Sequence, residues 1–339
     1  MSYRTRFVGI VVIGRNEGER LRRCLASVVP GGHPVVYVDS GSADGSAELA
    51  RSTGAIVVEL DPSIPFTAAR GRNAGFRQLM EMFPAIHFVQ FVDGDCELTP
   101  GWLDAAAAIM NSEPKLAAVR GNLLERNRDC SVYARLCNME WRGPVGDICS
   151  TGGIALFRVD AFQQAGGFDA KIVAGEEAEL CRRLLAKGCV IRRIDAEMGT
   201  HDCAMTRFVE WWKRTARSGH SFAESAVSEA GATDRNRHAV NSIMFWTLLL
   251  PALVAALVWP TRGLSLLLLL SYLVLWFRVA RSRRARGDSS SDARLYATFC
   301  VIGKFAQARG VLMYHWNQSV RRKRSRLIEY KSPATTRPH

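Results

Sequence analysis

The chain has 339 residues, and its 45 lysines and arginines outnumber its 32 aspartates and glutamates, which leaves a formal net charge of +13. This length is enough for one large α/β domain and additional segments. The positive charge favours an anionic partner: a nucleic acid, a phosphorylated substrate or a membrane surface. The cysteines are odd in number and form no C-x-x-C pair. They are typical of reduced cytosolic thiols and argue against a disulfide framework or a zinc site.

The first part of the chain alternates between apolar, β-branched runs and helical stretches. The predicted strands cover residues 7–14, 34–40, 55–60 and 86–93, and the predicted helices between them cover 17–29, 44–54 and 67–83. This order predicts a parallel sheet covered by helices on both faces. The run at 7–14 resembles a signal peptide, but it is short and no cleavage site follows it, so we expect a buried strand.

Polar side chains follow these strands where ligands of α/β sheets bind, beyond the carboxyl ends. Arg15 and Glu17 follow the first strand, Asp39 ends the second, and Asp93 and Asp95 end the fourth. Two carboxylates one residue apart repel each other, and a divalent cation would compensate for them. Mg²⁺ or Mn²⁺ prefers oxygen ligands and shares one or two carboxylates with substrate phosphates. The sequence therefore predicts a metal site here.

The composition changes near residue 240. Residues 243–259 and 264–277 contain no charged side chain and are separated by a short turn, 260–263. As helices they would span roughly 25 and 21 Å, less than the hydrocarbon core of about 30 Å. The pair could cross a thinned bilayer, extend by a few residues at each end, or form a shallow re-entrant hairpin. A hairpin in the core of a soluble protein is the remaining alternative.

The flanks of the apolar pair suggest an orientation. The segment 278–294 is rich in arginine, whereas the turn between the apolar runs carries only Arg262. The positive-inside rule then places the globular part in the cytosol, at the inner (cytoplasmic) membrane. Tryptophans and a tyrosine near the ends of the runs are suited to anchor at the membrane interface. Because the arginines flank apolar segments, lipid phosphate explains the charge better than nucleic acid, and no nucleic-acid partner is expected.

Two further segments follow the apolar pair. Residues 295–314 place Leu295, Phe299 and Ile302 on one helical face, which predicts an amphipathic helix in the plane of the membrane. The basic tail 321–326 is either a solvated end or a contact with anionic lipids.

Six motifs occur in an order that resembles a family-2 glycosyltransferase of the GT-A fold, in a membrane-attached bacterial-type member. They are VVIGRNEGERLRRCLASV, VDSGSADGS, AARGRNAGF, FVDGDCELTPGWL, GGIALFRVDAFQQAGGFD and VAGEEAELCRRLLAKG. The resemblance covers about residues 7–225. It implies a Rossmann-like, mostly parallel nucleotide-sugar domain. One departure is visible, since Gly14-Arg15-Asn16-Glu17 replaces the usual Pro-x-Tyr-Asn-Glu of the family.

The resemblance implies a nucleotide-sugar donor, a divalent metal and roles for the strand-end residues. Asp39 would hold the base and Arg72 would lie near the nucleotide, with Arg15 and Glu17 in the same donor site. Asp93 would approach the ribose or the metal. The metal, Mg²⁺ or Mn²⁺, would be ligated by Asp95.

The resemblance also implies a catalytic carboxylate. The usual base of the family corresponds to Glu177, which follows Glu176. The alternative is that these glutamates only favour the N-terminus of a helix. His201 follows a predicted strand and would complete the metal shell, or else it is structural. Trp212 and Arg214 resemble an element that contacts the acceptor or diphosphate in some members, or they belong to an amphipathic helix resting on the membrane.

These inferences predict an inverting glycosyltransferase that transfers sugar to a lipid-linked or envelope glycan acceptor beside a membrane with anionic lipids. A polyprenyl-phosphate sugar synthase is the enzymatic alternative, and a catalytically silent membrane scaffold is the alternative of another class. The predicted division is a GT-A domain over 1–225, a linker over 226–242, a transmembrane or re-entrant hairpin over 243–280, and a basic loop, amphipathic helix and basic tail over 281–339.

Overall fold

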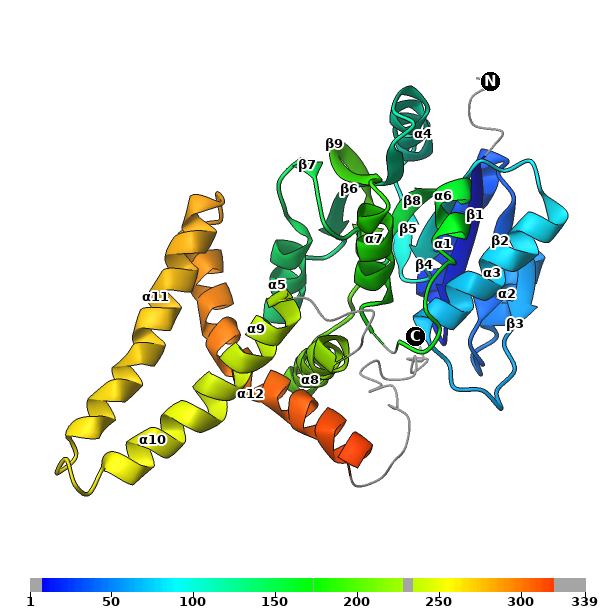
Figure 1. Ribbon diagram of the computed structural model, residues 1–339. Helices are drawn as coiled ribbons and strands as arrows, with labels where there is room; N and C mark the ends of the chain where they lie inside the picture. The colour runs from blue at the N-terminus through cyan, green and yellow to red at the C-terminus, as the bar shows by residue number, and fades with distance from the viewer. Residues whose placement is uncertain (1–7, 173, 228–233, 320–339) are drawn as a thin grey trace. The chain divides into compact units, whose positions relative to one another are not determined.

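The structure is a computed structural model that describes residues 8–172, 174–227 and 234–319 (Figure 1). The described chain forms two compact units. The first contains residues up to Arg128 together with Trp141–Ala204, and the second contains Asp129–Glu140 together with the described residues from Met205 onward. The basic tail predicted at 321–326 lies outside the described residues.

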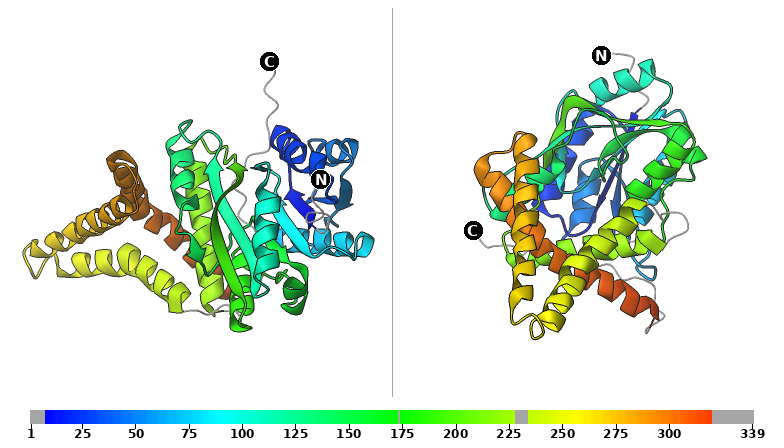
Figure 2. Two further views of the ribbon diagram at one scale, coloured as in Figure 1. Left: turned by 90° about the horizontal axis from the view of Figure 1, so that it is seen from above. Right: turned by 60° about the vertical axis from the view of Figure 1, so that its left-hand side comes forward.

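The first unit is built on a nine-stranded sheet within the described residues. Its strands are β1 (Val8–Gly14), β2 (Val35–Asp39), β3 (Ile56–Glu59), β4 (Phe88–Asp93), β5 (Cys96–Leu98), β6 (Leu116–Glu125), β7 (Gly146–Asp147), β8 (Ala155–Arg158) and β9 (Val190–His201). They lie in the order β3-β2-β1-β4-β8-β6-β9-β5, with β7 paired to β9. The long strands β6 and β9 are neighbours along their length (Figure 2).

The first four strands are parallel, as the sequence predicts. The sheet as a whole is mixed, because β8 enters between β4 and β6 from the opposite end and pairs antiparallel with both. Beyond it, β6 and β9 are again parallel. All the predicted strands and helices before residue 94 form, with bounds within a few residues of the prediction.

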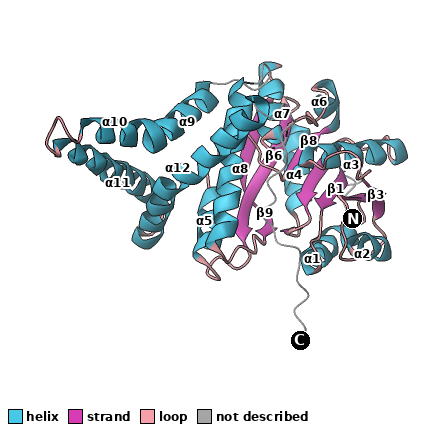
Figure 3. Ribbon diagram, turned by 90° about the horizontal axis from the view of Figure 1, so that it is seen from below, coloured by secondary structure: helices cyan, strands magenta, loops and turns pink. Residues whose placement is uncertain are grey.

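Helices cover both faces of this sheet, which lies between them in Figure 3. They are α1 (Glu19–Val28), α2 (Ser46–Ser52), α3 (Ala68–Met82), α4 (Trp102–Ser112), α6 (Val159–Gln164) and α7 (Glu176–Ala186), with a short 3₁₀ turn at Val29–Gly31. Successive strand residues face opposite sides, and accordingly Ile10 packs with α1 and α4 whereas Val11 packs with α3 and α7. The two cores hold the strand ends rigidly.

The second unit is helical. Its elements are α5 (Val132–Trp141, whose last residue belongs to the first unit), α8 (Phe208–Val227), α9 (Asp234–Met244), a π-helical segment η2 (Phe245–Leu249), α10 (Leu250–Leu257), a 3₁₀ segment η3 (Leu264–Leu269), α11 (Leu270–Ala285) and α12 (Ser290–Ser319). Helix α8 packs against α12. The described part of the first compact unit therefore ends at Ala204, and the predicted catalytic domain over 1–225 stays a prediction.

The apolar pair forms two continuous helices of 22 residues each, Asn236–Leu257 and Leu264–Ala285. Each is about 33 Å long at 1.5 Å per residue, because both extend beyond the uncharged runs. Only 22% and 11% of their most apolar windows are buried. A hairpin in a soluble core would be mostly buried, so the exposed apolar surface favours membrane association.

The expected amphipathic helix is part of α12, but its apolar face is covered by protein. Leu295, Phe299 and Ile302 pack in a cluster with Trp211 of α8 and Tyr133 of α5. The Trp211 and Phe299 rings meet edge to face at 4.7 Å. Protein side chains therefore already cover part of the face that was predicted to rest on the membrane.

One arginine of the basic segment is structural. The buried Arg283 forms an ion pair with Asp288 at 2.5 Å and donates a hydrogen bond to the Met139 carbonyl oxygen at 3.0 Å. Its guanidinium also lies 4.4 Å from the Tyr296 ring centre. Arg283 thus joins α5, α11 and α12, and only the other arginines of this segment are available to a partner.

Candidate functional site

Two loops at the carboxyl ends of β1 and β2 are joined by hydrogen bonds. The Asn16 N–H donates to Ser42 Oγ at 2.9 Å, and the Ala43 N–H donates to Asn16 Oδ1 at 2.8 Å. The Gly18 N–H donates to Asp44 Oδ2 at 3.0 Å. Asn16 adopts a φ of 54°, in the left-handed region that asparagine tolerates better than most residues. These contacts fix the loops after β1 and β2 to each other, and together the two loops form a rim beside Asp39.

Asp39 is buried at the end of β2 and is held in one orientation. Its carboxylate accepts hydrogen bonds from the Tyr37 hydroxyl at 2.9 Å and from the Ser42 N–H at 2.7 Å. Burial and the adjacent carboxylate raise the pKa of Tyr37 above its usual range, so the phenol stays a donor. A fixed acceptor at a strand end is suited to recognise an N–H group of a ligand.

The other predicted donor residues on β1 lie on the same rim. The Arg15 guanidinium lies 5.3 Å from the centre of the Phe66 ring. Glu17 is buried and forms an ion pair with Arg20 at 2.9 Å. Their expected roles toward the donor stay predictions.

Arg72 connects three elements at the centre of the site. It lies on α3, is 3% exposed, and donates to Glu176 Oε1 on α7 at 2.5 Å and to Asp93 Oδ1 on β4 at 2.8 Å. Gly153 lies against this pair, since a Cβ there would be 2.6 Å from Arg72 Nη2 and 3.0 Å from Asp93 Oδ2. The glycine is needed for the close approach of the loop before β8.

Glu177 lies next to this bridge, in the first turn of α7. Burial, together with the negative charges of Glu176 and Asp93, raises the pKa of Glu177 to about 7, although the Arg72 guanidinium acts in the opposite direction. A carboxyl group with this pKa exchanges a proton near neutral pH, which is the property that a general base or acid requires. The structure thus brings Glu177 together with Arg72, Asp93 and Glu176.

A second group of side chains forms where β5, β6 and β9 end. His201 Nε2 lies 3.5 Å from Asp95 Oδ2, and His201 Nδ1 lies 2.6 Å from Glu125 Oε1. Glu125 also accepts hydrogen bonds from Trp141 Nε1 at 2.7 Å and from the Cys203 N–H at 3.2 Å. Carboxylates therefore lie on both sides of the imidazole.

The sequence analysis missed Glu125. It is a single glutamate at the end of an apolar run, and 76 residues separate it from His201. The only signal in the sequence is its place as a carboxylate directly after the run LAAVRGNLL. Pairing of β6 with β9 in parallel, with Glu125 opposite His201, is what brings the two side chains together.

The donor set fits a divalent cation. Ligand atoms of Asp95, Cys96 and His201 lie within 4.8 Å of one another. Burial and the nearby aspartates raise the pKa of the Cys96 thiol well above its usual value. Mg²⁺ and Mn²⁺ prefer oxygen ligands to a thiol, so the Asp95 carboxylate and the His201 imidazole are the candidate ligands. Asp93 is outside this close group, since it is bound to Arg72.

The ionisation of His201 depends on its carboxylate neighbours. Burial alone lowers the pKa of an imidazole, but Asp95 and Glu125 outweigh it and raise the pKa of His201 well above its usual value. A metal at Nε2 would compete with a proton for that nitrogen.

The predicted acceptor residues lie on α8, in the second unit. Trp212 packs at the edge of the aromatic cluster around Trp211, and Arg214 forms an ion pair with Glu140 at 2.8 Å. Both are thus engaged within their own unit, and a role toward an acceptor stays a prediction.

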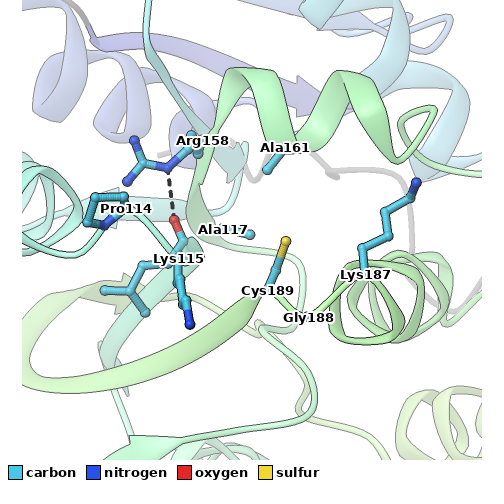
Figure 4. Close-up of a pocket in the computed structure, with 9 residues that line it drawn as sticks. Pro114, Lys115, Ala117, Arg158, Ala161, Lys187, Gly188 and Cys189 are labelled. Atoms are coloured by element: carbon cyan, nitrogen blue, oxygen red, sulfur yellow. Dashed lines mark hydrogen bonds between the residues drawn. The ribbon is translucent and has the colours of Figure 1, made fainter.

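A cavity of about 290 Å³ lies at the other end of the strands (Figure 4). Lys115 and Cys189, which precede β6 and β9, line it, as does Arg158 at the end of β8. The Arg158 guanidinium donates hydrogen bonds to the carbonyl oxygens of Leu116 at 3.0 Å and Met110 at 2.5 Å. The cavity contains none of the predicted site residues.

Comparison with known proteins identifies the family. The profile of "Glycosyl transferase family 2" matches residues 9–164, and that of "Glycosyl transferase family group 2" matches residues 88–282, more than half of the chain. The chain is 28% identical over 326 residues to a pre-mycofactocin glycosyltransferase of Mycobacterium tuberculosis, covering 92% of this chain and 65% of that protein. It is 25% identical over 211 residues to the glycosyltransferase AglE of Haloferax volcanii, covering 58% of this chain and 66% of that protein.

The chain thus spans about two thirds of the length of these curated relatives. Among solved structures, it is similar to the mannosyltransferase PcManGT of Pyrobaculum calidifontis, which was solved with GDP-Man and Mn²⁺. That likeness has a TM-score of 0.56 at 16% identity and covers 92% of this chain and 88% of the other. At this identity it establishes the fold. The chain therefore belongs to the family-2 glycosyltransferases, and it has a GT-A-type α/β domain followed by C-terminal helices.

Proposed function

We propose that this glycosyltransferase is metal-dependent and inverting, and that it transfers a sugar from a nucleotide-diphosphate donor to a lipid-linked or envelope glycan acceptor at the cytosolic face of the inner membrane. One observation carries the proposal. Asp39, the Asp93 and Asp95 pair, Glu177 and His201, which come from separate parts of the sequence, gather at one edge of a single sheet. Ligands of α/β sheets bind at this edge.

The donor would lie along the ends of β2, β1 and β4. Asp39 is held by Tyr37 and Ser42 in an orientation that can accept a hydrogen bond from a base. Arg15 and Glu17 would border the nucleotide, and Asp93 would approach the ribose. Arg72 would keep Asp93 in place while remaining paired with Glu176.

Asp95 and His201 would hold Mg²⁺ or Mn²⁺, and Asp93 would lie near the bound ion. Such a cation, when bound, neutralises the charge of the diphosphate leaving group. Glu125 would fix the tautomer of His201, because it binds Nδ1 and leaves Nε2 directed to Asp95. Carboxylates that bind the second nitrogen of a ligating histidine commonly act in this way.

Glu177 would take the proton of the acceptor hydroxyl as the oxygen bonds to the anomeric carbon. Attack from the face opposite the leaving diphosphate inverts the configuration at that carbon. The raised pKa of Glu177, about 7, makes the proton transfer efficient near neutral pH. Glu176 would act as a positioning residue through its ion pair with Arg72.

The second unit would attach the enzyme to a membrane containing anionic lipids. Both 22-residue apolar helices are mostly exposed. Exposed arginines lie in the last turns of the second helix and directly after it, at positions 278, 281, 284 and 286. Lys and Arg next to apolar helices attract anionic headgroups. An acceptor carried by a lipid would thereby be concentrated near the enzyme.

The test is a screen of nucleotide-sugar donors with purified protein, Mg²⁺ or Mn²⁺ and membrane lipid extract, with release of the nucleoside diphosphate as the signal. We expect turnover with one donor, dependent on both metal and lipid extract. Turnover with purified polyprenyl phosphate alone would instead favour the polyprenyl-phosphate sugar synthase, which needs no strong base. Absence of nucleotide release with every donor and with both metals would contradict the proposed function.

A further inference from the structure

Arg120 is a cation at the same edge of the sheet to which the proposed function assigns no role. It lies on β6, two residues after Ala118, so the two side chains face the same side of the strand. Ala118 packs in the cluster that contains Leu180 and Leu184 of α7. Arg120 therefore lies on the side of the sheet that α7 covers, where its charge interacts with that of Glu177.

Two consecutive glycines lie against two guanidinium groups in this region. A Cβ at Gly153 would be 2.6 Å from Arg72 Nη2, and a Cβ at Gly152 would be 3.3 Å from Arg120 Nη1. Gly152 has a φ of +71°, which glycine adopts at little cost. The loop before β8 thus runs closely past Arg72 on one side and Arg120 on the other.

The two arginines differ in how their charges are compensated. Arg72 is bound to Asp93 and Glu176. Arg120 forms no ion pair among the described residues, and its buried Nε has no hydrogen-bond partner there. The neighbouring cation Arg193 donates instead to Asn122 Oδ1 at 2.9 Å. Within the described part of the chain, Arg120 is therefore a largely buried cation without an ion-pair partner.

Such a group costs stability unless a ligand supplies the missing partner. Burial, and then the positive charge of Arg193, lowers the pKa of Arg120 to about 10, while the charge of Glu177 acts in the opposite direction. The guanidinium is still charged at neutral pH. Its planar fork of donors matches a carboxylate or a phosphate.

We propose that Arg120 binds an oxyanion of a bound substrate, a phosphate or a carboxylate, beside the Glu177 carboxyl group. The inference rests on the proposed function. The oxyanion would come from the diphosphate of the donor or from an anionic group of the acceptor. The sheet order favours the acceptor, because β6 lies beyond β4 and β8, on the side away from Asp39 on β2.

The test uses Arg120→Gln, which removes the positive charge, and Arg120→Lys, which keeps the charge but offers fewer hydrogen-bond donors. Arg192→Gln is the matched control, since Arg192 lies on β9 beside Val119 and is paired with Asp147 and Glu113 at 2.7 and 2.5 Å. Arg120→Gln should melt at the parental temperature or above it, because it removes an uncompensated buried charge. The melting temperature thus shows whether Arg120→Gln is folded before its binding is measured.

Two calorimetric titrations distinguish the sources of the oxyanion. In the first, UDP, GDP and dTDP are titrated with Mg²⁺, and the tightest of them is compared with its nucleoside monophosphate. In the second, inorganic phosphate is titrated into the protein saturated with that diphosphate and Mg²⁺, and also into the free protein. A bond to a charged group contributes enough that its loss should weaken binding about ten- to hundred-fold.

Weaker phosphate binding in Arg120→Gln, but not in Arg192→Gln, would assign the oxyanion to the acceptor. Weaker binding of the diphosphate with unchanged binding of the monophosphate would assign it to the donor. Arg120→Lys should retain part of either affinity. The inference would be overturned if Arg120→Gln and the parent bound the diphosphate and inorganic phosphate with equal affinity. It would also be overturned if neither protein bound either probe. If the parent binds no diphosphate with metal, the proposed function fails, and the titration of the free protein still tests Arg120.

Discussion

At the scale of single residues, the site holds two adjacent glutamates in different surroundings. Glu176 is paired with Arg72, whereas its neighbour Glu177 has a pKa raised to about 7 by burial and by adjacent negative charge. A carboxyl group whose pKa lies near neutral pH is typical of acid–base sites. The two glutamates can therefore be distinguished by experiment.

Glu177→Gln should retain donor affinity and lose transfer by about 10²–10⁴-fold, the usual contribution of a general base. Glu176→Gln should lose less transfer but should unfold at a lower temperature, because it weakens the buried pair with Arg72. Both variants are compared in one transfer assay, with donor binding measured by calorimetry. Transfer by Glu177→Gln at the parental rate would show that the base lies elsewhere or that the acceptor is a phosphate.

The pH dependence follows from the same group. As pH falls through about 7, Glu177 becomes protonated and can no longer accept a proton, so kcat/KM should fall about tenfold per pH unit below that value. In Glu177→Gln this limb should be absent. A parental profile that stays flat from pH 5 to 8 would contradict the assignment.

The raised pKa of Glu177 also predicts a change in stability. The folded protein binds the proton more tightly than the unfolded chain does, so the contribution of Glu177 to stability is full below its unfolded pKa and is lost as pH rises through about 7. Glu177→Gln should therefore be more stable than the parent at pH 8, by on the order of 1–3 kcal/mol. The difference should disappear near pH 4, and urea unfolding at the two pH values measures it.

At the scale of secondary-structure elements, the strand ends and the loop before β8 determine the site. Parallel pairing of β6 with β9 places Glu125 beside His201, and the antiparallel β8 delivers Gly153 against Arg72 and Asp93. The contribution of each of these contacts to ligand binding can be tested with one substitution and one control substitution elsewhere in the first unit.

Glu125→Gln should weaken metal-dependent binding of the nucleoside diphosphate about 10–100-fold, the usual effect of removing a carboxylate that orients a ligating histidine. Glu97→Gln is the control, since Glu97 lies on β5 and pairs with Arg126 and Arg23. Calorimetry with Mn²⁺ measures both. Unchanged affinity in Glu125→Gln would mean that His201 does not depend on this hydrogen bond for metal binding.

Gly153→Ala should disturb the Arg72–Asp93 pair, because its Cβ would lie at 2.6 and 3.0 Å from their polar atoms. We expect lower donor affinity and a lower melting temperature. Gly71→Ala is the control: its Cβ would lie 3.4 Å from Ile13 Cγ2, an ordinary contact, and alanine favours the interior of α3 by up to about 1 kcal/mol. Equal loss of donor affinity in the two variants would contradict the argument from close approach.

At the scale of the whole molecule, the two compact units differ in the residues that they hold. The first unit holds the carboxylates and His201, and the second holds both long apolar helices. Helices α5 and α8 belong to the second unit, where Leu136 and Trp211 bury each other's apolar surface. The unit that bears the apolar helices thus has an apolar core of its own.

A reporter placed after residue 227 or after residue 288 should indicate the cytosol, and one placed after Gly263 should indicate the opposite side. The reason is that two helices of about 33 Å each are long enough to cross the hydrocarbon core twice, and the arginine-rich segment favours the cytosol. Compartment-specific reporter activity is the measurement. A cytosolic signal at Gly263 would indicate a re-entrant hairpin, and an external signal after residue 288 would contradict two crossings.

The sequence by itself determined the α/β class, the parallel first half of the sheet, the apolar pair and most of the candidate residues. These features follow from local patterns: strand and helix periodicity, charge distribution and carboxylates directly after buried strands. Asp93 and Asp95 are one residue apart, so their proximity is a property of the chain. The six motifs in order added the family, which the comparisons confirm.

Only the tertiary structure decided which distant groups meet. The contact of His201 with Glu125, the bridge from Arg72 to Asp93 and Glu176, and the uncompensated charge of Arg120 all depend on strand order and register. The same holds for the apolar face of α12, which local periodicity assigned to a membrane and which α8 covers instead. The periodicity of a local sequence shows that one face of a helix is apolar. It does not show what buries that face, because burial depends on packing between segments that lie far apart in the chain.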